Sequence, residues 1–255
     1  MSFVCFVVLP QMIVPGPLRI LDLTLDSAAE NVALDDVLLR ATDEQDAPPL
    51  LRLWELTEYA VVVGRANRIE RNVNLAACRA DGVPIIRRSS GGGTVLLGPG
   101  SLVYSLVLRV NSGSRLVDID GTTRIIMERI QSAVAGLLAG VEREGVSDLA
   151  IDAIKFSGNS QRWLRRAMLH HGTLLYNFDL DRMERYLGTP ERVPDYRHGR
   201  DHRTFLRNIP VPRDVLTGAL TKEWDARLPM PRPDLMPVRD AVRERYGCAE
   251  WTFKR

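Results

Sequence analysis

Lysine is the residue type that this sequence most nearly lacks. Lysine and arginine together number 34, but only three of these residues, Lys155, Lys222 and Lys254, are lysine. Every basic residue before Lys155 is an arginine. A lysine ammonium is a compact point charge on a flexible stem, whereas the guanidinium of arginine is planar, so the two do not replace each other. Lys155 therefore marks a position that either needs an ammonium or carries one by chance.

Cysteine and metal-ligand patterns are also absent. The three cysteines, Cys5, Cys78 and Cys248, lie far apart and form no C-x-x-C pair. This spacing argues against disulfides and a cysteine-built metal site, and it fits a reducing cytoplasm. His198 and His202 have the i,i+4 spacing of zinc ligands on a helix, but Gly199 and the surrounding arginines argue against such a helix. We assign no metal ligand.

Neither a strong net charge nor a long apolar run is present. The net charge of +2 argues against a dedicated nucleic-acid binder. No run approaches the 18 apolar residues of a membrane span, so we expect no membrane partner. Residues 1–17 are apolar but contain three prolines and no basic segment. We interpret them as a disordered leader, with a signal peptide as the alternative.

Three catalytic signatures are missing as well. The chain has no Gly-Lys pair and hence no Walker A loop, no G-x-G-x-x-G fingerprint and no G-x-S-x-G elbow. Nucleophilic catalysis by the protein is therefore not indicated. The remaining chemistry is positioning and charge stabilisation, which suits reactions at phosphates and activated carboxylates.

Hydrophobic periodicity predicts strands and helices mixed without a βαβ rhythm. The predicted strands are 18–24, 50–56, 59–64, 83–88, 101–110, 148–151, 154–158 and 166–178. The predicted helices are 26–42, 74–82 and 120–140, with further helices around 213–224 and 237–246. Several strands are joined by short turns, and 148–158 reads as a hairpin. This pattern predicts an α+β domain with a mixed, mostly antiparallel sheet packed with helices.

Three consecutive glycines, Gly91 to Gly93, separate two predicted strands and follow Arg87, Arg88 and two serines. A backbone without Cβ atoms can approach a ligand closely and present N–H groups to an anion. The segment is therefore interpreted as a cradle for a phosphate or carboxylate. The alternative is a hairpin turn, although three glycines exceed what such a turn needs.

Strand alternation separates the two adjacent histidines of 166–178. His170 shares its face with Met168 and Leu174, whereas His171 shares the more polar face with Thr173. We expect His171 to contact a ligand and His170 to be a hydrogen-bonded core histidine.

Several segments together resemble the lipoate–protein ligase family, within the wider group of biotin/lipoate ligases and octanoyltransferases. These segments include "NVALDDVLLR", "IIRRSSGGGTV", "DLAIDAIKFSGNSQ" and "LHHGTLLYNFDLDRMERYL". The resemblance covers roughly 18–209. It implies a fold related to class II tRNA synthetases and biotin ligases, with a catalytic domain at 18–210 and a helical C-terminal extension at 211–255. It also implies a short form without the accessory domain of longer ligases.

The resemblance implies an ATP-dependent enzyme. Lipoate or octanoate would react with ATP, accompanied by Mg²⁺, to give an acyl-AMP and pyrophosphate. The acyl group would then pass to a lysine of a carrier, which is a lipoyl domain or the glycine-cleavage H protein. A small accessory subunit is a further potential partner. Lys155 would be catalytic, and the acyl-adenylate would contact Arg88, Ser90, Gly91, Gly92, Gly93, Thr94, Ser157, Gly158, His171, Gly172 and Thr173.

The sequence departs from the family at two motifs. Where the family has a His-Asp pair and then an asparagine after the glycines, this chain has Leu97, Gly98 and Ser101. The family's "SGSAQ" is "SGNSQ" here, and we expect Asn159 and Ser160 to donate hydrogen bonds in its place.

The main alternative is an acyltransferase that takes octanoyl or lipoyl groups from an acyl-carrier thioester without ATP. The ligase-like transferases carry a cysteine shortly before the segment that corresponds to 148–151, and residues 139–151 contain none. The ligase is therefore favoured. A non-catalytic module that binds acylated carriers or nucleotide and a biotin ligase are the remaining alternatives.

Arginines gather in 192–207, with Arg162, Arg165 and Arg166 elsewhere. They form either a solvated basic face or a docking surface for an acidic carrier. Docking would raise the association rate more than the affinity. We then expect the rate of carrier modification to fall steeply with added salt while the rate of acyl-AMP formation does not. Stopped assays of both steps across a salt series measure this, and an equal salt dependence would argue against docking at these arginines.

Overall fold

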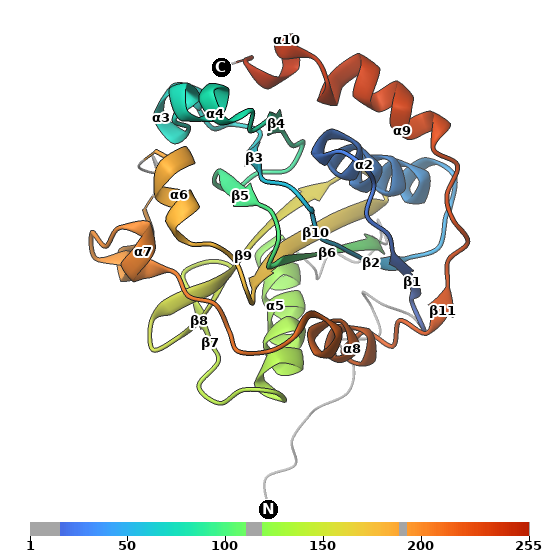
Figure 1. Cartoon of the computed structure of the whole chain (residues 1–255). Coiled ribbons are helices and arrows are strands. Elements are labelled where there is room, and N and C mark those ends of the chain that lie inside the picture. The colour runs from blue at the N-terminus through green and yellow to red at the C-terminus, as the bar shows by residue number, and fades with distance from the viewer. Residues whose placement is uncertain (1–15, 111–118, 189–192, 255) are drawn as a thin grey trace, which may run out of the picture.

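The computed structural model describes residues 16–110, 119–188 and 193–254, and its centre is a long mixed sheet (Figure 1). Residues 1–15 of the predicted leader lie outside the described residues. From one edge to the other the strands are β11 (Leu228–Pro229), β1 (Arg19–Asp22), β2 (Leu50–Trp54), β6 (Ser101–Arg109), β10 (Ala167–Leu175), β9 (Ile154–Trp163), β8 (Asp148–Ile151) and β7 (Glu142–Glu144). β1 is parallel to both of its neighbours, and every pair from β2 to β7 is antiparallel. The predicted α+β class with a mostly antiparallel sheet is confirmed.

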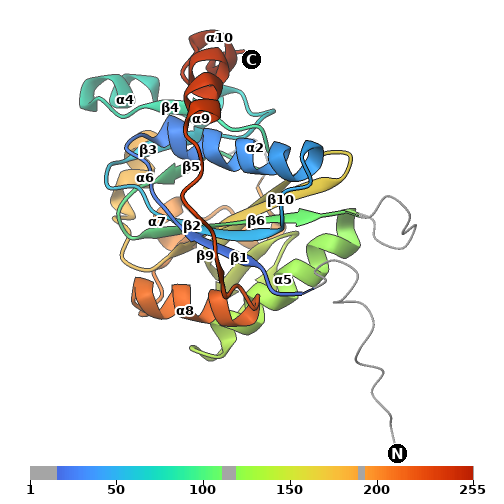
Figure 2. The same cartoon turned by 90° about the vertical axis from the view of Figure 1, so that its right-hand side faces the viewer.

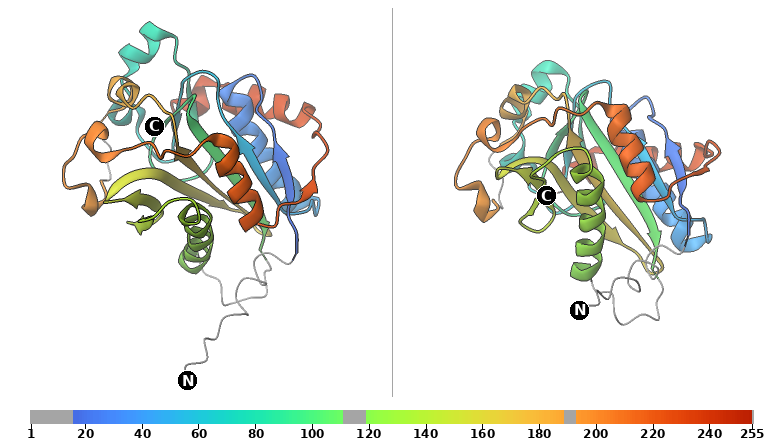
Figure 3. Two further views of the ribbon diagram at one scale, coloured as in Figure 1. Left: turned by 60° about the horizontal axis from the view of Figure 1, so that its bottom comes forward. Right: turned by 90° about the horizontal axis from the view of Figure 1, so that it is seen from below.

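Helices cover both faces of this sheet (Figure 2). α2 (Ala28–Glu44) lies on one face and begins with a capping box between Ser27 and Glu30. α5 (Ile119–Ala135) and α8 (Arg213–Glu223) lie on the other face and pack against each other (Figure 3). The prediction that α5 continues to Gly140 is wrong, because the helix ends at Ala135.

After β11, which pairs with β1 at the edge of the large sheet, the C-terminal segment wraps over α2. It contains α9 (Met236–Ala241), the π-helical turn η2 (Val242–Tyr246) and α10 (Ala249–Thr252). α9 and η2 contact α2, and α10 contacts β4. Among the helices of the described residues, none has the length and apolar character needed to cross a membrane.

A second, three-stranded sheet carries the glycine segment. Its order is β4 (Ile85–Arg87), β3 (Ala60–Val63) and β5 (Val95–Leu97), so β3 lies between the other two. The glycines therefore cross from one side of β3 to the other, and the alternative of a hairpin turn is wrong. β2 and β3, which follow each other in sequence, belong to different sheets. Four short helices cover the nearby surface, namely α3 (Ile69–Asn72), α4 (Leu75–Asp81), α6 (Asp181–Tyr186) and α7 (His202–Phe205).

The predicted hairpin at 148–158 is confirmed. β8 and β9 pair antiparallel through a turn at Asp152 and Ala153, whose φ angles of 54° and 56° are left-handed. Both central residues of a type I′ turn have positive φ, and this turn matches the twist of the two strands. The ladder shifts register between Leu149 and Ala150, so Ala150 pairs with Lys155.

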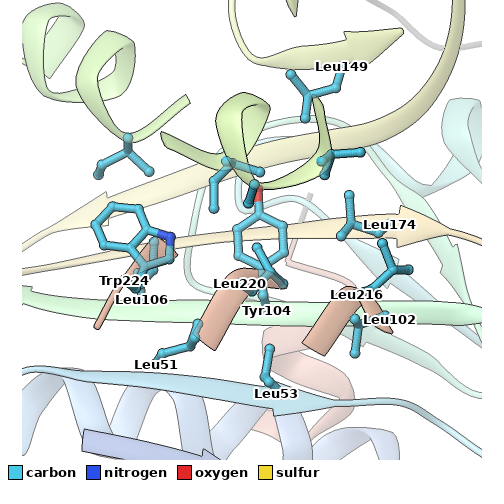
Figure 4. Packing of buried hydrophobic residues seen from close by; sticks show 14 of the residues in the cluster. Leu51, Leu53, Leu102, Tyr104, Leu106, Leu149, Leu174, Leu216, Leu220 and Trp224 are labelled. Atoms are coloured by element: carbon cyan, nitrogen blue, oxygen red, sulfur yellow. The ribbon is translucent and has the colours of Figure 1, made fainter. Parts of the chain in front are cut away.

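The alternation predicted for β10 decides which core each of its side chains joins. Met168 and Leu174 pack in the cluster between the large sheet and α5 and α8 (Figure 4), together with Tyr104 of β6. Leu169 packs on the opposite face, in the cluster that α2 covers. His170 and His171 therefore point to opposite faces, as the alternation predicts.

His170 is buried, with 1% of its surface exposed, but the expectation that it is hydrogen-bonded is wrong. Neither ring nitrogen has a partner within the described residues. The ring stacks on Tyr104, with 6.5 Å between the ring centroids. Burial, with a smaller contribution from the neighbouring His171, lowers the pKa of His170 to about 3, so the ring is neutral at neutral pH.

The neutral state of His170 links stability to pH. Its pKa is about 3 in the folded chain and 6.5 in the unfolded chain, so between these values the unfolded chain binds more protons. This contribution to stability is present above the unfolded pKa and is lost as the pH falls toward the folded one. Between pH 6.5 and pH 5 the loss from this group is about 2 kcal/mol.

Replacing the ring should remove this dependence. We expect His170→Leu to reduce the difference in unfolding free energy between pH 7 and pH 5 by about 2 kcal/mol, measured by urea denaturation at both values. The exposed His198, replaced by Asn, is the control. An unchanged pH dependence in His170→Leu would show that the ring does not stay neutral.

Candidate active site

The glycine segment forms an exposed loop that a buried arginine holds from beneath. The guanidinium of Arg88 donates from Nη2 to the carbonyl oxygens of Gly91, at 2.6 Å, and Gly93, at 2.7 Å. No described residue accepts a hydrogen bond from the amide of Gly92 or of Gly93. All three glycines of the loop are exposed. Two successive unpaired amides in a glycine loop can bind an anion. Burial lowers the pKa of Arg88 to about 10, so the guanidinium stays charged at neutral pH.

Gly92 occupies a place where a side chain does not fit. Its φ of +76° is left-handed, and an added Cβ would lie 3.0 Å from Nη2 of Arg88 and 3.2 Å from Ser160 of β9. Its carbonyl oxygen lies over Gly64, where an added Cβ would overlap it. The loop therefore depends on glycine both for its backbone conformation and for its close approach to β9.

The second arginine, Arg87, ties the loop to the rest of the chain. It is buried and donates from Nε to the carbonyl oxygen of Thr252 at 2.9 Å and from Nη1 to that of Asn67 at 2.8 Å. Trp251 returns a hydrogen bond from its indole N–H to the Arg87 carbonyl at 2.8 Å. Thr94 donates to the Asn67 side chain at 3.2 Å. The C-terminal helix α10 thus holds the strand that enters the loop.

His171 connects the loop to a buried carboxylate. Its Nε2 lies 2.7 Å from Oγ of Ser90, which accepts a hydrogen bond from Nε of Arg88 at 2.9 Å. Its Nδ1 lies 3.7 Å from Oδ2 of Asp35 in α2. A carboxylate favours a proton on Nδ1, which leaves Nε2 to accept from the Ser90 hydroxyl. Four polar groups therefore form one continuous chain from the helix to the loop.

Arg52 neutralises the carboxylate of Asp35, at the buried end of this series of polar groups. Its side chain is fully buried in β2, and its Nη1 lies 2.6 Å from Oδ1 of Asp35. Nη2 donates to the Asn31 side chain at 2.6 Å and to the carbonyl oxygen of Leu23 at 3.0 Å. Ser105 of β6 donates to Oδ2 of Asp35 at 2.7 Å. A buried charge needs this degree of pairing and hydrogen bonding.

The pKa values of Asp35 and His171 follow from this pairing. Burial alone would raise the pKa of Asp35, but Arg52, His171 and Ser105 together lower it below its usual value, so the carboxylate is ionised. Burial lowers the pKa of His171; the nearby carboxylate of Asp35 opposes this shift, and the nearby Arg88 reinforces it. His171 is therefore neutral at neutral pH, and its Nε2 can accept a hydrogen bond from the Ser90 hydroxyl.

Lys155 lies on the same face of β9 as the loop contact. Its Nζ is 2.8 Å from Oδ1 of Asp148, and both side chains are partly exposed. A Cβ added to Gly158 would lie 2.9 Å from this Nζ, so the ammonium occupies the space above Gly158. Gly158 and Ser160 alternate with one residue between them and thus share a face. Because Gly92 packs on Ser160, Lys155 and the glycine loop lie along one side of β9.

Other predicted site residues lie on β9 and on the neighbouring strand β10. Thr173 follows His171 on the same face of β10 and is partly exposed. The expectation that Asn159 donates hydrogen bonds is met within the fold, because its amide group donates to the Ser147 carbonyl at 2.7 Å and to Ser157 Oγ at 3.2 Å. Gly172 leaves the room in which Asn159 bonds Tyr104. The binding roles of Ser157 and Gly172 stay predictions.

The expectation that Ser160 donates a hydrogen bond is not met within the described residues. Its Oγ is buried and has no hydrogen-bond partner within the described residues. The hydroxyl lies beside Gly92, on the side of β9 that faces the loop. The hydroxyl therefore lies at the contact between the loop and β9 without a partner of its own in the described residues.

The site contains three charged residues that were not predicted from the sequence. Asp35, Arg52 and Asp148 all lie within segments that we predicted as helix or strand, yet we assigned none of them a role. Arg52 interrupts the apolar strand "LLRLW". A charged residue in a strand that is buried on both faces must have a partner, and this signal could have led to Asp35.

The arginines of the predicted basic face are largely engaged within the chain. Arg197 is buried, and its guanidinium lies 4.9 Å from the Phe205 ring. Arg200 donates to the carbonyl oxygens of Ala153 and Tyr196. Arg162 pairs with Asp36. The interpretation as a purely solvated face is therefore wrong for these residues, and docking of a carrier stays a prediction.

A separate surface cleft does not coincide with this site. It has a volume of about 860 Å³, lies beside α4 and α6, and contains none of the predicted site residues. Two of its arginines are paired, Arg182 with Asp179 and Arg185 with Asp81. The loop and Lys155 therefore remain the candidate site.

Known proteins match this chain in sequence. The family model of the lipoyl protein ligase A/B catalytic domain matches residues 27–209. A putative lipoate-protein ligase A from Aeropyrum pernix is 29% identical over 208 residues, which are 81% of this chain and 74% of that protein. A probable lipoate-protein ligase A from Mycoplasma genitalium is 30% identical over 243 residues, covering 88% and 68% of the two chains. An octanoyltransferase from Exiguobacterium is 26% identical over 176 residues, covering 60% and 63%.

Solved structures match the fold. A putative lipoate protein ligase from Thermoplasma acidophilum with bound lipoic acid has a TM-score of 0.78 at 21% identity and covers 94% of this chain and 100% of that one. A bipartite lipoate protein ligase from T. acidophilum, described with its E2 lipoyl domain, has a TM-score of 0.77 at 22% identity over 93% and 96%. A lipoate-protein ligase A bound with ATP gives 0.77 at 22% over 93% and 99%. At these identities the likeness shows the fold.

The buried ion pair should be costly to break. We expect Arg52→Met to lower the free energy of unfolding by about 3–5 kcal/mol, because the carboxylate of Asp35 is then buried without a counter-charge. Without Arg52, burial raises the pKa of Asp35, so the penalty should shrink as the pH falls and the group takes up a proton. Urea denaturation at pH 7 and pH 5 measures both effects.

A second variant separates the unpaired charge from the loss of packing. Arg52→Met combined with Asp35→Leu should recover most of the lost stability, because an apolar replacement of both partners removes the uncompensated charge. If the double variant were as unstable as Arg52→Met alone, the ion pair would not be the cause.

Proposed function

Because the chain belongs to the lipoyl protein ligase A/B catalytic domain family, we propose that it joins lipoate to a lysine of a lipoyl carrier protein. The carrier is a lipoyl domain or the glycine-cleavage H protein. The reaction uses ATP and passes through lipoyl-AMP. The family match, the lipoic acid and the ATP of the similar structures, and the E2 lipoyl domain of the T. acidophilum system support this proposal.

One observation in this chain carries the proposal. The ammonium of Lys155 and the exposed loop with the unpaired amides of Gly92 and Gly93 lie along the same side of β9. A fixed set of N–H donors and one mobile cation suits a ligand whose phosphate and acyl oxygens carry negative charge. Ser160 adds a hydroxyl with no partner within the described residues at the point where the loop meets the strand.

In the first half-reaction a lipoate carboxylate oxygen attacks the α-phosphorus of ATP, and the bond to pyrophosphate breaks. The chain contributes charge stabilisation and positioning. The loop amides receive phosphate oxygens, and Arg88 stays beneath them to hold the carbonyl groups away from the anion. The neutral His171 and Ser90 fix Arg88 from the side, so the loop keeps one shape as charge moves.

In the second half-reaction the amine of the carrier lysine attacks the acyl carbon of lipoyl-AMP. The carbonyl oxygen gains negative charge, AMP departs, and the nitrogen loses a proton to give the amide. Lys155 is placed to follow the oxygen that carries this charge. An ammonium on four methylenes can move between phosphate and carbonyl oxygens, whereas a guanidinium fits one geometry.

Mg²⁺ is expected to accompany ATP, where it would neutralise phosphate charge. The described residues contain no group of three or more His, Cys, Asp or Glu side chains that could hold a metal ion. Mg²⁺ commonly keeps several waters and takes substrate phosphates as ligands. Its ligands would then come mainly from ATP and water.

Acyl transfer from a carrier thioester without ATP is the second candidate, because an octanoyltransferase is among the relatives. That chemistry needs an activated cysteine. Cys78 is buried in α4, and burial raises its pKa. Cys248 lies at the start of α10 and bonds the carbonyl of Arg243. Of the two cysteines in the described part of the chain, one is buried and the other is bonded to the preceding helical turn, which favours the ATP-dependent reaction.

Two parallel reactions distinguish these candidates. The purified chain is given a lipoyl carrier with lipoate and Mg·ATP in one reaction, and with an octanoyl-carrier protein and no ATP in the other, and mass spectrometry detects the product. Product in the first alone supports a ligase that needs no accessory subunit. Product in the second alone overturns the ligase assignment. With neither, synthetic lipoyl-AMP is supplied, and transfer from it would identify a chain that needs a partner for adenylation.

Lys155 should be essential to transfer. We expect Lys155→Ala to lower the rate of transfer from synthetic lipoyl-AMP by about 100-fold or more, as removal of a single charge-stabilising donor does. Lys155→Arg should also be impaired, because the planar guanidinium does not reach the same oxygens. Lys222→Ala is the matched control. Both Lys155 variants should keep the wild-type thermal transition, and a near-normal rate in Lys155→Ala would reject the assignment.

A further inference from the structure

The arginine-rich segment 193–207, which follows α6, is attached to β9, the strand that carries Lys155. The amide of Arg207 donates to the Lys155 carbonyl at 2.9 Å, and Leu206 pairs with Lys155 in a parallel bridge. Arg200 donates from Nη2 to the carbonyl oxygen of Ala153 at 2.9 Å. The segment therefore lies against the β8–β9 turn, next to the backbone of the proposed catalytic lysine.

Tyr196 reaches from this segment to the carboxylate that holds the ammonium. It lies in the short 3₁₀ turn η1 (Asp195–Arg197). Its hydroxyl donates to Oδ2 of Asp148 at 2.7 Å, while Oδ1 of the same carboxylate lies 2.8 Å from Nζ of Lys155. The two oxygens of Asp148 are thus engaged from opposite sides, one by a phenol and one by an ammonium.

Packing fixes the position of the Tyr196 ring. The ring lies against Phe205, with 5.2 Å between centroids and an interplanar angle of 48°. The guanidinium groups of Arg197 and Arg200 lie 4.9 Å and 5.3 Å from the Phe205 ring. Arg200 also donates to the Tyr196 carbonyl at 2.7 Å. The phenol is therefore presented by a packed group of aromatic and arginine side chains.

We propose that Tyr196 is a positioning residue that sets the place of the Lys155 ammonium through Asp148. This inference rests on the proposed function for its catalytic consequence. Without the phenol, the Asp148 carboxylate is free to rotate, and the ammonium bonded to it has no fixed place above Gly158. An ammonium that starts from one defined place reorganises less when it moves to the oxygen whose charge grows. The arginine-rich segment is then a brace for Lys155.

A spectroscopic experiment tests the positioning without any assay of activity. The chain has only three lysines, so ¹⁵N-lysine labelling gives three ammonium groups, and Lys155→Arg assigns the signal of interest. Lys222 and Lys254 are exposed and serve as internal references. Tyr196→Phe removes only the hydroxyl. Tyr176→Phe is the matched control, because the Tyr176 hydroxyl donates to Glu55, a carboxylate outside the site, at 2.8 Å.

We expect Tyr196→Phe to speed solvent exchange of the Lys155 ammonium about tenfold, the change that loss of one hydrogen bond to a charged group gives. The signals of Lys222 and Lys254 should not change, and Tyr176→Phe should leave all three as in the wild type. Lys155 exchange in Tyr196→Phe that equals the wild type would overturn the proposal.

A kinetic experiment tests the consequence for catalysis. Transfer from synthetic lipoyl-AMP to a lipoyl domain should have a kcat about tenfold lower in Tyr196→Phe, with the KM for lipoyl-AMP little changed. In an Asp148→Asn background the same change should have no further effect, because Tyr196 acts through that carboxylate. Independent, multiplying effects of the two substitutions would overturn the proposed route.

The two experiments keep the two proposals apart. A wild-type chain that does not transfer from lipoyl-AMP contradicts the proposed function, while the ammonium exchange rates still decide whether Tyr196 positions Lys155. A wild-type chain that transfers normally, with Tyr196→Phe equally active, contradicts this inference alone.

Discussion

The ion pair between Arg52 and Asp35 is the interaction on which the site depends. Both side chains are removed from water, so each needs the other, and the hydrogen bonds around them satisfy the remaining donors and acceptors. The ionised Asp35 then orients His171, which contacts Ser90, and Ser90 contacts Arg88 under the glycine loop. A charge pair between a helix and a strand in the core is thereby connected to a loop on the surface.

This arrangement separates a buried part of the site from a partly exposed one. The loop is fixed by buried groups whose protonation states do not change near neutral pH. Lys155, in contrast, is partly exposed and is held by one carboxylate above a glycine. Fixed donors suit the phosphate, which stays in place through both proposed half-reactions, and a long flexible side chain suits the oxygen whose charge changes.

Periodicity predicted most of the secondary structure because the elements are long and their apolar patterns are regular, as in β10 and the capped helix α2. The same alternation placed His170 and His171 on opposite faces. It could not predict that β2 and β3 join different sheets or that the glycine loop crosses β3, since strand order is a property of tertiary packing. The partners of Lys155 and His171 were missed for the same reason. Asp148 and Tyr196 are 48 residues apart in sequence, and only the fold brings them together.

The anchoring of Arg87 couples the glycine loop to a distant part of the chain. This arginine precedes the glycine loop, yet its Nε bonds the carbonyl of Thr252, and its own carbonyl receives the indole N–H of Trp251. The strand that enters the loop therefore lacks two of its hydrogen bonds in any state in which α10 is detached. A substitution that loosens α10 should thus also loosen the glycine loop, although the two are more than 150 residues apart in sequence. A helix remote from Lys155 in the sequence can in this way change how well the loop binds a ligand.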